Sequence, residues 1–115
     1  MRTIIAGGRD CNDMSVLHDA LAYAKLDITT VICGEAKGAD TLGKIWAYEN
    51  NVPVESYPAN WEQDGKSAGY KRNVLMAENA EQLLALWDTK SKGTKHMIDI
   101  ATKNKIKVTI YITKT

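Results

Sequence analysis

Cysteine, net charge and long apolar stretches are all scarce in this chain of 115 residues. Its two cysteines, Cys11 and Cys33, stand in no metal-ligand or CxxC spacing, which favours reduced thiols over a disulfide scaffold. Only a short apolar run follows Arg2, so the sequence predicts neither a signal peptide nor a membrane-spanning helix. We therefore expect a soluble, cytoplasmic protein with no metal site and no cofactor.

The formal net charge is only +1, which provides no strong field for binding nucleic acid or a membrane. A hydrophobic content of 44% and a charged content of 25% are ordinary for a folded protein and argue against disorder. The length predicts a single domain over residues 1–115. Six lysines make the last third locally basic, which could suit a phosphate ligand but is more simply a solvated surface: Lys90, Lys92, Lys95, Lys103, Lys105 and Lys107.

Short apolar runs alternate along the chain with longer amphipathic segments. Their spacing predicts strands at 3–7, 30–33, 52–57, 82–87 and 106–113, and helices at 13–25, 39–50, 68–80 and 91–101. Pro53 predicts an edge or strand-start position for the third strand. The uninterrupted apolar run of the fourth strand predicts cover on both faces. In the second helix Leu42, Ile45 and Trp46 are expected to face inward, and residues 58–67 are expected to form a polar loop.

This alternation predicts an α/β fold, a single Rossmann-like three-layer domain whose five-stranded, mainly parallel sheet has helices on both faces. The natural strand order is 3-2-1-4-5, which makes the first and fourth strands neighbours where the winding reverses. Ligands bind at the carboxyl ends of such strands. The segments that leave them are 7–10 and 88–94, so both are expected at a ligand crevice.

Three strand-to-helix turns carry glycine, at 7–10, 34–40 and 91–94. Glycine allows a close approach of backbone to ligand, and a helix that follows offers free N–H groups to an anion. Three such turns on one edge favour a phosphate or ribose-phosphate site, although glycine can also simply end a strand. The GxxxxGK[ST] and GxGxxG patterns are absent, which disfavours an ATPase or an ordinary dehydrogenase.

Four blocks in order carry a family resemblance: "GGRD", "GEAKGADTLGKIWA", "YPANWEQDGKSAGYKRN" and "LLALWDTKSKGTKHMI". From Ile4 to about Val108 the chain resembles the YspA-like (cpYpsA-related) family of the SLOG superfamily, which also includes the LOG nucleotide hydrolases and the DNA-processing protein DprA. The resemblance implies a Rossmann-like fold that binds a nucleotide or nucleotide-derived small molecule. Many members are suspected of sensing or processing such signals in bacteria and their phages. It also implies a homo-oligomer.

The candidate ligand-binding residues come from these blocks. Arg9 can offer a bidentate fork to phosphate, and Asp40 is about equally a helix cap or a ligand contact. Trp61 could stack on a base or fill the core, and Asp88 could accept from a ribose hydroxyl. The complete set is Gly7, Gly8, Arg9, Asp10, Gly34, Glu35, Lys37, Gly38, Asp40, Trp61, Lys66, Arg72, Asn73, Asp88, Ser91, Gly93 and Thr94.

The last glycine turn bears on catalysis. In the hydrolytic relatives a glutamate follows its Gly-Thr pair and can stabilise an oxocarbenium-like state during N-glycosidic cleavage. Here Lys95, His96 and Met97 follow Thr94, so the resemblance favours binding without turnover, and no catalytic residue is assigned.

Two alternatives remain open. A nucleoside 5'-monophosphate hydrolase could use Glu35, Asp10 or Asp88 instead, with His96 as a general acid. Single-stranded DNA binding like that of DprA is the least favoured, because the chain is near neutral and carries no nucleic-acid motif.

Overall fold

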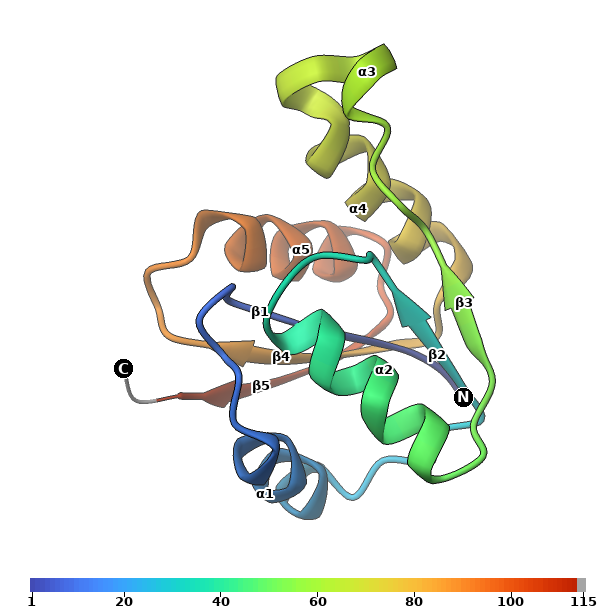
Figure 1. Cartoon of the computed structure of the whole chain (residues 1–115), viewed down its shortest axis with the longest axis vertical. Coiled ribbons are helices and arrows are strands. Elements are labelled where there is room, and N and C mark those ends of the chain that lie inside the picture. Colours follow the sequence, from blue (N-terminus) through green and yellow to red (C-terminus); the bar gives the residue numbers. More distant parts are fainter. Residues whose placement is uncertain (114–115) are drawn as a thin grey trace.

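Five parallel strands form one sheet at the centre of the molecule (Figure 1). The computed structural model describes residues 1–113. The strand order is β3-β2-β1-β4-β5, as the sequence predicts. The strands are β1 (Arg2–Gly7), β2 (Thr30–Cys33), β3 (Val54–Ser56), β4 (Gln82–Trp87) and β5 (Lys107–Ile112). The short β3 follows Pro53 and forms an edge, which confirms the interpretation of that proline.

Helices cover both faces of the sheet. On one face lie α1 (Met14–Ala24) and α2 (Ala39–Glu49), and on the other lie α4 (Ala68–Asn79) and α5 (Lys92–Lys103). The buried side chains of β4 alternate between these two layers, so Leu83 and Ala85 pack beneath α4 and α5 while Leu84 and Leu86 pack towards α1 and α2. The expectation that this strand is covered on both faces is therefore confirmed.

The predicted polar loop before α4 is partly helical. It contains α3 (Trp61–Asp64) and a 3-10 turn, η1 (Gly65–Ser67). The side chain of Asn60 accepts a hydrogen bond from the backbone N–H of Gln63 at 3.1 Å, which caps the first turn. The polar composition of this segment does not indicate a helix, so α3 was not predicted. The helix projects beyond the rest of the domain (Figure 1).

Ile45 in α2 does not face inward as predicted, since 43% of its surface is exposed. The buried face of α2 runs through Ala39, Gly43 and Ala47, which are spaced by four residues. Ile45 lies two positions from Gly43 and from Ala47, and so falls on the opposite side of the helix. Leu42 is buried as predicted and Trp46 is partly buried.

Among residues 1–113, no helix has both the length and the apolar character needed to cross a membrane.

Candidate functional site

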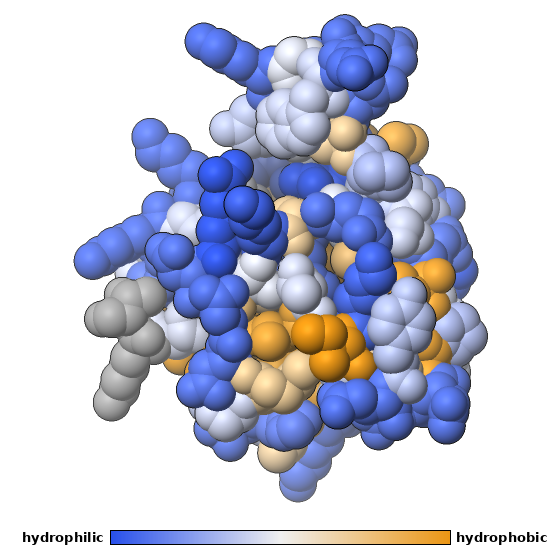
Figure 2. All heavy atoms as spheres, viewed as in Figure 1, coloured by the Kyte–Doolittle hydropathy of each residue, from blue (hydrophilic) through white to orange (hydrophobic). Residues whose placement is uncertain are grey.

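A cleft of about 640 Å³ lies at the carboxyl edge of the sheet. Its walls come from the turns after β1 and β2, from the α3–α4 segment and from the first turn of α5. This volume is within the range of small-molecule sites. The position matches the predicted crevice, where the winding of the sheet reverses. In Figure 2 the region between the projecting α3–α4 segment and the body of the domain is bordered largely by hydrophilic residues.

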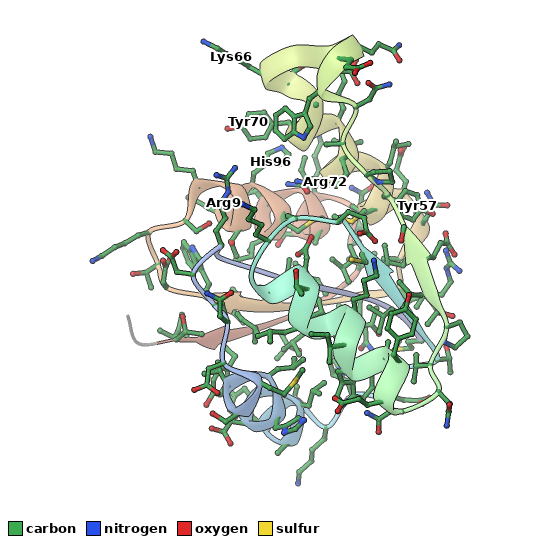
Figure 3. The ribbon with its side chains drawn as sticks, viewed as in Figure 1. Arg9, Tyr57, Lys66, Tyr70, Arg72 and His96 are labelled. Carbon is green, nitrogen blue, oxygen red and sulfur yellow. The ribbon has the colours of Figure 1, made fainter. Side chains whose placement is uncertain are left out.

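Four cationic side chains come from three walls of the cleft: Arg9 after β1, Lys37 after β2, and Lys66 in η1 with Arg72 in α4. Within residues 1–113, none of these four side chains forms an ion pair. Figure 3 shows Arg9 and Arg72 at the space between α5 and the α3–α4 segment, whereas Lys66 extends outward from the projecting tip. The two arginines are therefore the better placed anion donors.

Arg72 is held in position by the backbone of the neighbouring wall. Its Nη1 donates to the carbonyl oxygen of Gly34 at 2.6 Å, and its Nε donates to Oδ1 of Asn73 at 3.2 Å. Both bonds fix the plane of the guanidinium. A cation held in this way loses little side-chain freedom when an anion binds.

Asp40 is a carboxylic acid buried at the base of this wall. Only 7% of its surface is exposed, and Oδ2 accepts from the backbone N–H of Ala36 at 3.3 Å. Burial raises the pKa of Asp40 to about 6, against the opposing effect of the nearby Arg72 charge. Gly38, not Asp40, is the N-cap residue of α2. The carboxyl group therefore serves the turn after β2 and lines the cleft rather than capping the helix.

The glycine at position 38 is required by packing. Its φ is +82°, and a Cβ there would lie 2.2 Å from the carbonyl oxygen of Gly8. The turn after β2 is thus packed directly against the turn after β1. The N–H of Ala39 donates to the same carbonyl oxygen of Gly8 at 3.3 Å. Gly38 itself does not line the cleft.

Glu35 reaches the cleft with its carboxylate already engaged. It accepts from Nζ of Lys44 at 3.1 Å and from Oγ of Ser56 at 2.7 Å. The bond from Ser56, followed by that from Lys44, holds the pKa of Glu35 below its ordinary value. This carboxylate is therefore a charged acceptor that braces the wall.

The first turn of α5 forms the facing wall. Ser91 is its N-cap, and its Oγ accepts from the backbone N–H of Thr94 at 3.3 Å and lies 3.0 Å from Thr94 Oγ1. The preceding Asp88 uses Oδ1 to accept from the N–H groups of Lys90 and Ser91, both at 2.8 Å. These bonds hold the pKa of Asp88 below its ordinary value and shape the turn.

Two exposed aromatic residues border the cleft on the projecting segment. Trp61 is 57% exposed and Tyr70 is 50% exposed. A Cβ on Gly69 would lie 3.6 Å from Cη2 of the Trp61 ring, so the indole lies beside the start of α4. Trp61 therefore does not fill the core. Of its two predicted roles, only stacking on a base is compatible with its exposed position.

The structure brings most of the predicted residues together, and four of them lie outside the cleft. A second, smaller cavity of about 410 Å³ lies beside the start of α1 and is bordered by Gly8, Asp10 and Asp88. Gly38 borders neither the cleft nor this cavity. The ligand-binding roles of all seventeen stay predictions. The cleft also includes residues that sequence reasoning did not assign: Ala6, Ala36, Pro58, Ala59, Gly69, Tyr70, Met76 and Met97.

Most of these additional residues are apolar, and nothing in the sequence separates an apolar residue on a cleft floor from one in the core. Tyr70 is the exception, because it belongs to the same block as Arg72 and lies on an exposed face of α4. Within residues 1–113, no three His, Cys, Asp or Glu side chains are grouped so as to hold a metal ion.

A doubly wound parallel sheet with a cleft at the reversal of its winding defines a Rossmann-like α/β domain. Among solved structures, the domain is similar to DNA processing protein A (DprA) from Streptococcus pneumoniae, with a TM-score of 0.74 and 16% sequence identity. The similarity covers 95% of this chain and 49% of that one, so the chain spans about half of DprA, and it shows the shared fold alone.

Sequence comparison defines the family. A model of the YspA, cpYpsA-related SLOG family matches residues 1–63, which is more than half of the 115 residues. The Gene 61 protein of Mycobacterium phage D29 is 35% identical over 116 residues, which cover 93% of each chain. This chain belongs to the YspA, cpYpsA-related SLOG family. Family membership suggests a nucleotide-related binding or glycosidase-like role.

Proposed function

We propose that this protein binds a nucleotide or nucleotide-derived small molecule in the cleft without turning it over. The observation that carries the proposal is the pair of arginines, Arg9 and Arg72, which border the cleft from different walls and form no ion pair with residues 1–113. A guanidinium that is exposed to a cleft and lacks an acidic partner is suited to a phosphate group.

The cleft also has two chemically different ends. The start of α5 and Arg9 offer hydroxyl, backbone and guanidinium donors, whereas Trp61 and Tyr70 offer exposed aromatic rings. A nucleotide has the same two parts, a phosphate and an aromatic base. Stacking of a base on an aromatic side chain contributes about 1–3 kcal/mol. This match of two ends supports a nucleotide rather than a simple phosphorylated sugar.

The absence of turnover rests on the acidic residues that could take part in glycosidic cleavage. Glu35 is engaged by Lys44 and Ser56, while Asp10 and Asp88 do not line the cleft. His96 and Met97 occupy the positions where the hydrolytic relatives carry glutamate. Of the three carboxylates that the sequence offers for hydrolysis, two therefore lie outside the cleft, and the charge of the third is paired with Lys44.

One observation favours the second candidate, a nucleotide N-glycosidic hydrolase. Asp40 lines the cleft, and its pKa of about 6 would let it exchange a proton near neutral pH. A carboxyl group of this kind could activate water or stabilise a developing ribosyl cation. Hydrolysis, if present, should therefore depend on Asp40.

Three measurements on the purified protein separate these functions. Mass spectrometry of the small molecules released by heat denaturation should find an intact nucleotide or nucleotide derivative. Incubation with nucleoside monophosphates should release no free base. Steady multiple-turnover base release that Asp40→Asn abolishes would replace the binding proposal with hydrolysis. Steeply salt-dependent retention of single-stranded DNA, with no nucleotide bound, would instead favour a nucleic-acid function.

A further inference from the structure

A chain of hydrogen bonds crosses from one wall of the cleft to the other through Asn73. This residue lies in α4 and is only 6% exposed. Its Oδ1 accepts from Nε of Arg72 at 3.2 Å, and its Nδ2 lies 3.1 Å from Nδ1 of His96 in α5. Arg72 continues the chain to the carbonyl oxygen of Gly34 at 2.6 Å. Asn73 is thus the link between the arginine and the histidine.

The chemistry of the arginine fixes the direction of these bonds. A guanidinium can only donate, so the atom of Asn73 that faces Arg72 must be its oxygen. The amide nitrogen then faces His96 and donates to Nδ1, which must carry a lone pair. The proton of the neutral imidazole therefore sits on Nε2. Reversing the amide would set two N–H groups against Arg72 and would break the bond that holds the guanidinium.

The surroundings of His96 agree with an uncharged ring. The ring of Tyr70 lies edge-on to it, with centroids 4.5 Å apart and an interplanar angle of 70°. Burial lowers the pKa of His96 below its ordinary value, and Asp99 on the same helix opposes that shift. From α4, the charged group that faces this region is Arg72, which is joined to His96 through Asn73. His96 is accordingly neutral at pH 7.

His96 lies next to residues that line the cleft. His96 is not itself a lining residue, but Gly93, Thr94 and Met97 of the same helix line the cleft, as do Tyr70 and Asn73 opposite, so its ring lies at the rim. Figure 3 shows His96 beside Tyr70, in the space between α5 and the projecting segment.

We propose that Asn73 is a positioning residue that keeps His96 as a neutral hydrogen-bond donor, through Nε2–H, at the side of the cleft. A neutral donor at position 96 is the opposite of the glutamate that the hydrolytic relatives carry after their Gly-Thr pair. A glutamate accepts hydrogen bonds and carries a negative charge. The ligand atom that meets His96 is then an acceptor, such as a phosphate, carbonyl or ring nitrogen atom. This consequence for the ligand rests on the function proposed above, whereas the state of the ring does not.

The state of the ring is tested on the ligand-free protein by two-bond ¹H–¹⁵N NMR of its histidines. The chain has two histidines, and the exposed His18 in α1 is the internal reference. We expect His96 to be the Nε2–H tautomer at pH 7.5 and to titrate below the ordinary pKa of a histidine. A His96 ring that is a mixture of the two tautomers at pH 7.5, or that carries its proton on Nδ1, would overturn the proposal.

The Asn73→Asp substitution tests the role of Asn73 directly. A carboxylate can accept from Arg72 and from His96 together, so it should move the imidazole proton to Nδ1 and raise the pH at which the ring titrates. An unchanged tautomer in a folded Asn73→Asp protein would remove Asn73 as the cause. If this variant does not fold, the wild-type spectrum alone still decides whether His96 is held in the Nε2–H form.

The donor role is tested with adenosine monophosphate (AMP) as the probe. His96→Gln keeps an acceptor for Asn73 and an N–H donor, so its affinity should stay within about threefold of wild type. His96→Glu keeps the acceptor but removes the donor and adds negative charge, so its affinity should fall by roughly tenfold or more. Equal affinities of the two variants would contradict the donor role. Failure of the wild-type protein to bind any nucleotide would contradict the proposed function and leave the NMR result standing.

Discussion

At the amino end of the sheet Arg2 forms an ion pair and further hydrogen bonds, whereas Arg9 and Arg72 at the carboxyl end form no ion pair among residues 1–113. Nη2 of Arg2 pairs with Glu55 at 2.8 Å, and its Nε donates to the carbonyl oxygen of Asn79 at 2.7 Å. Glu55 also accepts from the hydroxyl of Tyr57. The arginine at the amino edge is therefore neutralised by an ion pair, whereas the two arginines at the carboxyl edge are not.

This difference separates two uses of the same residue type. Arg2 joins β1 to β3 and to the end of α4, so its charge serves the fold. Arg72 is fixed by a carbonyl and an amide and forms no ion pair among the described residues, although the buried Asp40 lies near it. A guanidinium that is held in a fixed orientation without an ion pair is suited to bind the anionic group of a ligand.

The largest expected effect is on binding at the carboxyl edge. Arg72→Ala should weaken the binding of AMP by about a hundredfold, because it removes a pre-oriented, charge-assisted donor. Isothermal titration calorimetry measures this change, and circular dichroism checks that the variant is folded. The neighbouring Lys71→Ala is the matched control, because Lys71 is exposed and pairs with Asp64 at 2.9 Å. Unchanged affinity in a folded Arg72→Ala protein would remove this residue from the site.

Asp40→Asn should stabilise the protein at neutral pH. The pKa of Asp40 is about 6 in the folded protein and near 3.8 when unperturbed, so the folded state binds the proton more tightly. Wild-type stability attributable to this group therefore falls as the pH rises from about 4 to 6. Asparagine avoids that loss, and the variant should gain on the order of 1–3 kcal/mol above pH 6.

Chemical denaturation at several pH values measures the Asp40 effect. The gain should shrink towards zero below about pH 4, where the wild-type carboxyl group is neutral as well. Asp19→Asn, on the exposed side of α1, is the control and should change little. A gain that does not depend on pH would mean that the charge of Asp40 is not its cause.

Arg2→Ala should have the converse pattern to Arg72→Ala. The ion pair with Glu55 is about a third exposed on each side, at 36% and 38%, so its loss should cost only about 1 kcal/mol of unfolding free energy. Affinity for AMP should stay at the wild-type value. A large loss of affinity would break the distinction between the two edges, because it would make Arg2 part of the ligand site.

Gly93→Ala has the smallest expected effect on stability. A Cβ at Gly93 would meet no atom within 4 Å, and alanine favours the helix, so the variant should gain about 0.5 kcal/mol. The added methyl group would enter the mouth of the cleft, where it should weaken nucleotide binding. Thermal melts and titration calorimetry measure the two effects separately. Higher stability with unchanged affinity would move the ligand away from the start of α5.

The sequence predicted the sheet well because its signals are local and repeated. Apolar runs bounded by turns define the limits of β2 and β4, and alternation with helices leaves little choice of strand order. The inward prediction for Ile45 was wrong because apolar spacing does not reveal which of two adjacent stripes packs on the sheet. The short α3 was missed because its cap at Asn60 is compatible with a loop as well.

The site was harder to predict than the fold. A turn sequence indicates which residues leave the sheet at the carboxyl edge, but not the side to which each one points. Asp88 is an example, since its carboxylate turns back to the N–H groups of Lys90 and Ser91. Asp40 is the opposite case, because its raised pKa depends on burial that three-dimensional packing produces. The link from Arg72 through Asn73 to His96 likewise requires the packing of α4 on α5.

Arg72 reaches from α4 to the carbonyl oxygen of Gly34 after β2, across 38 positions of the chain. A molecule that contacts both segments is bound only while both are folded, so the unfolding of either one releases it. At a concentration one hundred times its Kd, such a molecule would add about 2.7 kcal/mol to the free energy of unfolding. The melting temperature of the domain is thus itself a detector of its ligand, and a panel of nucleotides can be ranked by thermal shift without a label or an activity assay.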